Sequence, residues 1–192
     1  NCMYGGNMEA ARHFYHYAQN LNHEMDDIAT SKWLDMHLCS LKAFYLYEKE
    51  EFDNSIKKHY EVLKMAEECG DSWVFGDACF EILKILYIQK KFEQKEDSRE
   101  ILALIQKLKK VARNSGLKHL QFKTILIEAL WNVNDNGEKS KELLDKMNIQ
   151  YHGKGLASVN RVEVLYFAWD ICQKLSLYET AENLKLQLIN TI

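Results

Sequence analysis

The stretch from Gly6 to Asn22, GNMEAARHFYHYAQNLN, carries the pattern from which the fold follows. Ala11 stands four residues before Tyr15, and Ala18 stands three residues after it, so the three side chains share one face of a helix. Small residues on such a face let a neighbouring helix approach closely, and the aromatic ring fills the space that remains. We therefore expect a helix near 7–21 that packs against other helices.

The end of this stretch introduces a turn that recurs along the chain. In three places an alanine is followed four residues later by asparagine or glycine: Ala18 and Asn22, Ala66 and Gly70, Ala112 and Gly116. Asparagine and glycine adopt the left-handed backbone that ends a helix at the lowest energetic cost. The alanines lie 48 and 46 residues apart, a period in the range of helix-pair repeats.

Helix-breaking residues are scarce in the rest of the chain. Its 192 residues include no proline and only eight glycines. Apolar residues recur at spacings of three and four, as in Leu38, Leu41 and Tyr45, and no segment alternates as a strand would. The pattern predicts about nine helices joined by short turns, near 7–21, 27–49, 52–69, 72–90, 97–115, 117–134, 137–148, 157–174 and 177–191.

The frame of small and aromatic residues returns less faithfully around Phe52, Ser55 and His59, and again at Tyr178 with Ala181. It resembles the second-helix signature of the tetratricopeptide repeat, with repeats longer than the usual 34 residues. The resemblance implies an all-α, right-handed α-solenoid of antiparallel helix pairs. We expect a single repeat domain over 1–192, with pairs near 1–21, 27–69, 72–115, 117–148 and 157–191.

The position of Gly6 bears on the extent of the protein. If Gly6 is the turn inside a hairpin, Asn1 to Tyr4 end a helix that begins upstream. We therefore expect the chain to be a fragment of a longer protein. At the other end, apolar residues run to Ile192, which suggests either a continuation or self-association through the terminal helices.

Composition narrows the class of protein. A content of 47% hydrophobic and 28% charged residues is typical of folded soluble proteins. The most apolar run, Phe80 to Ile88, is interrupted by Glu81 and Lys84, so we expect no membrane span. The five cysteines form no Cys-x-x-Cys pair, which predicts a reducing, cytoplasmic setting and disfavours a disulfide framework or zinc site.

No arrangement of residues in the sequence is typical of a catalytic site. His13 and His16 share one turn of a helix, and Glu9, one turn upstream of His13, is the one further candidate ligand, so ordinary surface histidines are the favoured interpretation. There is no phosphate-binding loop and no nucleophile motif. Cys39, Cys79 and Cys172 fall within apolar stripes and are expected to be packing residues. The sequence therefore predicts a protein that is not an enzyme and needs no cofactor or metal.

The charge is unevenly distributed. From Ile101 to Ile127 there are six basic residues and no acidic one: Lys107, Lys109, Lys110, Arg113, Lys118 and Lys123. Because the whole chain carries −3, the remainder carries −9 (−3 minus +6). A solvated helix face is one interpretation, and a binding surface for an acidic peptide or protein is the other. Nucleic acid is disfavoured by a pI near 6.2.

Aromatic side chains supply a second set of candidate binding residues. Neighbours on a helix point about 100° apart, so consecutive aromatics cannot all face one core stripe. In tetratricopeptide arrays the first helix of each pair lines a concave groove, which makes His37, Phe44 and Tyr47 candidate groove contacts. The alternative is that these three side chains pack between helices.

Two functional hypotheses follow from these patterns. The first is a protein-binding or peptide-binding module that serves as a scaffold or adaptor. The second is the sensory segment of a larger signalling or transcription-regulatory protein, since tetratricopeptide-like segments with long repeats occur in such regulators. An enzyme whose site is assembled from distant helices is the least favoured interpretation.

Overall fold

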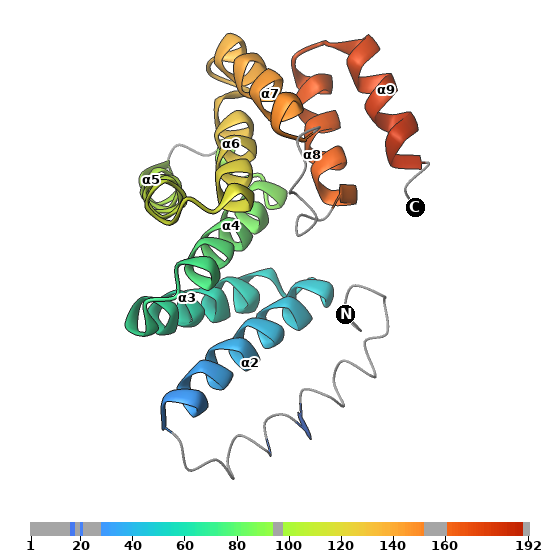
Figure 1. The fold of residues 1–192 in the computed structure, drawn as a ribbon. Coiled ribbons are helices and arrows are strands. Elements are labelled where there is room, and N and C mark those ends of the chain that lie inside the picture. Colours follow the sequence, from blue (N-terminus) through green and yellow to red (C-terminus); the bar gives the residue numbers. More distant parts are fainter. Residues whose placement is uncertain (1–15, 18–19, 21–27, 94–97, 152–160, 190–192) are drawn as a thin grey trace. The chain divides into compact units, whose positions relative to one another are not determined.

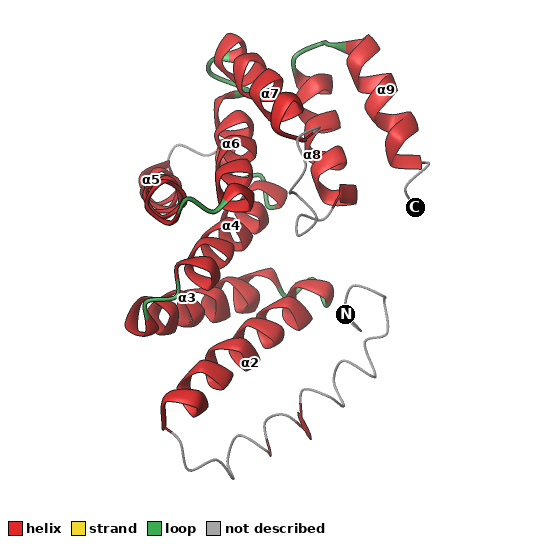
Figure 2. Cartoon of the chain, in the orientation of Figure 1, coloured by secondary structure: helices red, strands yellow, loops and turns green. Residues whose placement is uncertain are grey.

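The computed structural model describes residues 16–17, 20, 28–93, 98–151 and 161–189, and these residues form helices and connecting turns without any strand (Figures 1 and 2). The expected helix near 7–21 lies almost entirely outside the described residues, as do Asn22 and His13. By its internal contacts the chain divides into two compact units, Asn1–Ile85 and Leu86–Ile192, here called unit 1 and unit 2.

The described residues contain eight α-helices and one short 3-10 helix. Unit 1 holds α2 (Ile28–Glu48), α3 (Phe52–Cys69) and most of α4 (Ser72–Ile88). Unit 2 holds the end of α4, η1 (Lys91–Glu93), α5 (Ser98–Ser115), α6 (Lys118–Asn132), α7 (Gly137–Tyr151), α8 (Arg161–Lys174) and α9 (Tyr178–Ile189). All eight α-helices fall within four residues of the bounds expected from the sequence.

Several pairs of consecutive helices pack against each other. In unit 1, α2 lies antiparallel to α3 and is joined to it by a tight turn (Figure 1). In unit 2, α5 packs on α6, α6 on α7 and α8 on α9, and α6 also contacts α8. The all-α class is confirmed, whereas the solenoid arrangement and its handedness stay predictions. No helix in the described part of the chain is both long and apolar enough to cross a membrane.

Three of the turns share one backbone geometry. In each, an amide donates to the carbonyl five residues earlier at 2.9 Å: Glu51 to Leu46, Asp71 to Ala66 and Leu177 to Cys172. The residue before each of these amides has a left-handed φ, and only one of the three, Gly70, is a glycine. This is the Schellman closure, which satisfies the last carbonyls of a helix.

The fourth residue of three second helices is small and fully buried. It is Ser55 in α3, Ser140 in α7 and Ala181 in α9. Each serine hydroxyl donates at 2.8 Å to a carbonyl of the preceding helix, at Ala43 and Ala129 respectively. A small side chain at this position lets the two helices of a hairpin approach closely, and a small buried residue stands there in α3, α7 and α9.

The predicted cap glycines behave as expected. Gly70 and Gly116 have φ values of 69° and 66°, which L-residues with a side chain adopt at a cost. The structure adds left-handed residues that composition did not single out, Glu50, Lys90 and Ser176. These three residues end helices at the positions where glycine is otherwise favoured.

Candidate partner-binding surfaces

Helix α5 is strongly amphipathic. One face consists of Ile101, Leu104, Ile105, Leu108 and Ala112, all buried. Their spacing of three and four residues is that of a single stripe on a helix. The burial of this stripe fixes the rotation of α5, so the opposite face of the helix is turned to solvent.

The solvent face of α5 carries four exposed cations. They are Arg99, Lys107, Lys110 and Arg113, and within the described residues no ion pair involves any of them. Lys110 lies eleven residues after Arg99 and three residues before Arg113. These spacings place the side chains on one side of the helix. Leu102 lies beside them and is 41% exposed. We call these five residues the α5 basic face.

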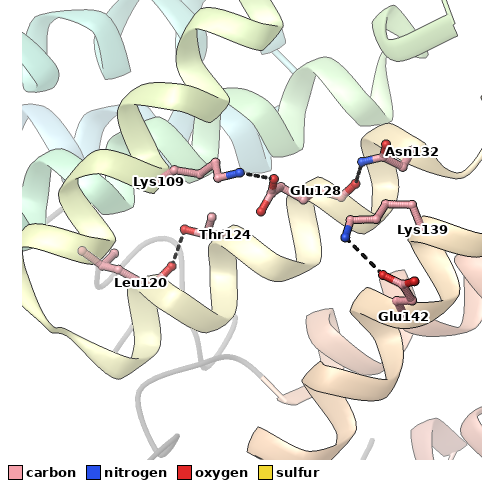
Figure 3. Close-up of polar contacts among 7 residues, drawn as sticks. All are labelled: Lys109, Leu120, Thr124, Glu128, Asn132, Lys139 and Glu142. Carbon is pink, nitrogen blue, oxygen red and sulfur yellow. Dashed lines mark hydrogen bonds and ion pairs between the residues drawn. The ribbon is translucent and has the colours of Figure 1, made fainter. Parts of the chain in front are cut away.

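Lys109 is turned away from the α5 basic face. Its ammonium group lies 2.6 Å from a carboxylate oxygen of Glu128, so this lysine ties α5 to α6 (Figure 3). Glu128 directly follows the acid-free segment that ends at Ile127. The predicted binding residue Lys109 is therefore already paired within unit 2.

The remaining two predicted cations belong to α6 and differ in exposure. Lys118, at the start of the helix, is exposed. Lys123 is only 8% exposed and lies among the buried residues of α6. Of the six predicted basic residues, Lys107, Lys110, Arg113 and Lys118 are exposed, Lys109 is half-buried and Lys123 is buried.

The aromatic candidates on α2 are half-buried, and they contact other helices of unit 1. The Phe44 ring meets the ring of His59 on α3 edge-on, with centroids 5.7 Å apart. Tyr47 contacts Phe52, and the Lys84 ammonium lies 4.6 Å from the centroid of the Tyr47 ring. The structure therefore places Phe44 and Tyr47 in contacts between helices.

His37 lies one turn from Trp33 on the same face of α2. The two ring centroids are 4.0 Å apart, and Trp33 is 50% exposed. Burial lowers the pKa of His37, an effect that the nearby Asp71 carboxylate partly offsets. His37 is thus largely neutral at neutral pH, and it lies beside an aromatic ring that is open to solvent.

A group of buried polar side chains lies deeper in unit 1. Glu81 and Lys84 form an ion pair on α4 in which both side chains are under one-tenth exposed. His59 on α3 is 1% exposed, and neither of its ring nitrogens has a hydrogen-bond partner. Burial lowers the pKa of His59 to about 4, with Glu81 raising it and Lys84 lowering it further. These groups are too deeply buried to contact a partner at the surface.

Unit 2 contains a polar contact inside an aromatic cluster. The Tyr87 hydroxyl donates to Asp170, and the Lys174 ammonium donates to the same hydroxyl at 3.0 Å. Burial, followed by the hydrogen bond to Asp170, raises the pKa of Tyr87. The rings of Phe92 and Phe167 pack against Tyr87 edge-on. The Tyr87 hydroxyl is neutral, and its two hydrogen-bond partners, Asp170 and Lys174, lie on α8. This contact therefore joins the end of α4 to α8.

Burial affects two of the four thiols in the described part of the chain. Burial raises the pKa of the Cys39 thiol to about 11 and also raises that of Cys172, which disfavours the thiolate needed for nucleophilic attack. Cys79 is buried, as expected, and Cys69 is exposed. No group of three or more His, Cys, Asp or Glu side chains in this part of the chain is placed to hold a metal ion.

Sequence reasoning missed two residues of the α5 basic face and did not single out the exposed Trp73. Arg99 and Leu102 belong to the α5 basic face, and the helical spacing from Lys110 and Arg113 was the available signal. Trp73 on α4 is 50% exposed, as is Trp33. Comparisons with protein-family models, with curated proteins and with solved structures give no match to this chain.

Proposed function

We propose that this chain is a helical-repeat binding module of the tetratricopeptide kind, and that it holds an acidic segment of a partner protein on the α5 basic face. The observation that supports this most is the set of four exposed cations on one side of α5, none of which has an ion-pair partner among the described residues. In this proposal the chain holds a partner protein and does not catalyse a reaction, which is the role of a scaffold or adaptor.

The recurring hairpin supports the repeat part of the proposal. Pairs α2–α3 and α8–α9 close with the same backbone turn and bury a small residue at the same position. Repeated hairpins present the outward faces of successive helices as an extended surface. Such proteins use this surface for binding, whereas their fold supplies no closed pocket by default.

A protein partner fits the α5 basic face better than nucleic acid does. The net charge of the chain is −3 and its pI is near 6.2, whereas proteins that bind nucleic acid are basic over a wider surface. The exposed Leu102 beside the cations offers an apolar contact to a partner side chain. An acidic segment with an apolar residue would satisfy both features, because charge steers the encounter and apolar burial adds affinity.

Charge reversal on the α5 basic face tests the proposal. We expect Lys107→Glu, Lys110→Glu and Arg113→Glu each to weaken binding of an acidic peptide that contains leucine by about two- to fivefold. The triple variant should weaken binding by at least about tenfold. Isothermal titration calorimetry at low ionic strength measures these affinities, and added salt should weaken wild-type binding because exposed charges are screened.

Lys139→Glu is the matched control, because Lys139 is an exposed lysine of unit 2 that lies on α7. It should leave the affinity of the acidic peptide within about twofold of wild type, since it lies outside the α5 basic face. Equal losses in the control and in the triple variant would contradict the proposal. So would tighter binding of duplex DNA or RNA than of the acidic peptide under the same conditions.

A further inference from the structure

Helix α9 packs on one neighbour and leaves another of its sides uncovered. Among the described helices its contacts are chiefly with α8, to which it lies antiparallel (Figure 1). Ala181 is buried, and Leu184 and Leu188 are half-buried. Spacings of three and four residues put these three side chains on one side of the helix, which is the side that faces α8.

Three large apolar side chains of α9 lie outside this contact. Tyr178, Leu186 and Ile189 have exposed fractions of 65%, 56% and 60%. In the described part of the chain, they are three of the four most exposed large apolar side chains, and Tyr17 is the fourth. Single exposed apolar residues are common on protein surfaces, whereas several on one short helix indicate a contact surface.

Two charged residues share this side of α9. Together with Glu182 and Lys185, the three apolar residues occupy about 100° of the helix circumference, and no other residue of α9 falls within that arc. We call these five residues the α9 stripe. The Lys185 ammonium lies 3.6 Å from a Glu182 carboxylate oxygen, and both side chains are more than half exposed. A pair this open contributes little to the fold, so both charges are available to a second molecule.

The α9 stripe is complementary to itself. If two copies of α9 lie antiparallel about a two-fold axis at the middle of the helix, Glu182 of each copy faces Lys185 of the other. In the same register, Tyr178 of each copy faces Ile189 of the other. A parallel pair would set glutamate against glutamate and lysine against lysine, which is repulsive. The remaining charge of α9, Glu179, lies beyond the edge of the stripe.

We propose that the α9 stripe is a self-association surface, on which a second copy of this chain packs its own α9 in the antiparallel direction. Burial of the three apolar side chains drives the association, and the two pairs between Glu182 and Lys185 select the second copy and its direction. Because α9 has 12 residues, the contact belongs among small interfaces, below about 1,200 Å² in total. We therefore expect a weak dimer with a dissociation constant in the micromolar range.

Charge reversal across the two-fold axis tests this arrangement. Sedimentation equilibrium of the full chain over a series of concentrations, at low ionic strength, measures the dissociation constant. We expect Glu182→Lys and Lys185→Glu each to weaken self-association by about five- to thirtyfold, because the symmetry brings like charges together twice. An equimolar mixture of the two variants should associate about as tightly as wild type, because opposite charges then face each other again. The double variant should also associate like wild type, for the same reason.

The exposed pair between Lys139 and Glu142 on α7 is the matched control, because it has the same spacing of three residues. Lys139→Glu and Glu142→Lys should leave the dissociation constant within about twofold of wild type. Ile189→Asp should weaken self-association by at least about tenfold, because two apolar contacts are lost in each dimer. Leu41→Ser, at an exposed apolar residue of unit 1, should have no such effect.

Three results would overturn the proposal. The first is a wild-type chain that stays monomeric up to about 1 mM, a concentration well above the expected dissociation constant. The second is unchanged association of Glu182→Lys, because another surface would then hold the two copies. The third is a mixture of the two charge variants that stays monomeric. Circular dichroism establishes that each variant is folded, and the double variant replaces a single variant that is not.

Discussion

Acidification from about pH 7 to about pH 4 is expected to remove roughly 3 kcal/mol from the free energy of unfolding of unit 1 through His59 alone. Burial lowers the pKa of His59 to about 4 from the usual 6.5. As the pH falls below 6.5, the unfolded chain takes up the proton first, whereas the folded chain resists it. The stability is therefore fully present above that pH and is lost progressively down to about pH 4.

Urea unfolding at a series of pH values measures this loss. Replacing Trp131 and Trp169 by phenylalanine confines tryptophan fluorescence to Trp33 and Trp73 of unit 1. In this background, His59→Phe should remove the His59 part of the pH dependence, while His16→Gln, at an exposed histidine, should not. An equal pH dependence with histidine and with phenylalanine at position 59 would show that burial of His59 does not control the stability.

Loss of one partner from the buried ion pair should be the most damaging single change. We expect Lys84→Met to lower the free energy of unfolding by about 3–5 kcal/mol, because the Glu81 carboxylate then stays buried without its cation. The double variant Glu81→Leu with Lys84→Met should recover part of this loss, since apolar residues can replace a buried pair at little cost. Urea unfolding followed by circular dichroism measures both variants.

The pair between Lys58 and Glu61 is the matched control. It has the same spacing of three residues and an N–O distance of 2.6 Å, but both side chains are more than one-third exposed. Lys58→Met should therefore lower the free energy of unfolding by no more than about 1 kcal/mol. If Lys58→Met and Lys84→Met lowered the free energy of unfolding by similar amounts, burial of the Glu81–Lys84 pair would not determine how much the pair stabilises the fold.

The sequence predicted the helices well, because hydrophobic periodicity and cap residues are local signals. Gly70 and Gly116 were identified since a left-handed cap favours glycine. Glu50 and Ser176 were missed, because neither is a residue type that favours a left-handed backbone. Ser140 was missed as a member of the repeat frame, because it makes the same contact as Ser55 without the aromatic residue that usually precedes it.

The candidate surfaces were predictable only where they follow helical spacing. The positive charge of the segment with Lys110 and Arg113 could be read directly, and helical spacing places both residues on one face. The pairing of Lys109 with Glu128 could not be read, because it joins residues 19 positions apart on two helices. Glu81 and Lys84 interrupt an apolar run, and their spacing of three fits an exposed pair as well as a buried one.

Mapping the bound acidic peptide by hydrogen–deuterium exchange tests the central proposal most directly. Peptide binding is expected to slow amide exchange in α5 (Ser98–Ser115), while α9 (Tyr178–Ile189) keeps its exchange rates. The variant with glutamate at positions 107, 110 and 113 should lose this protection at the same peptide concentration. Protection in α9 or in α2 (Ile28–Glu48) without any change in α5 would contradict the proposal that the α5 basic face holds the partner.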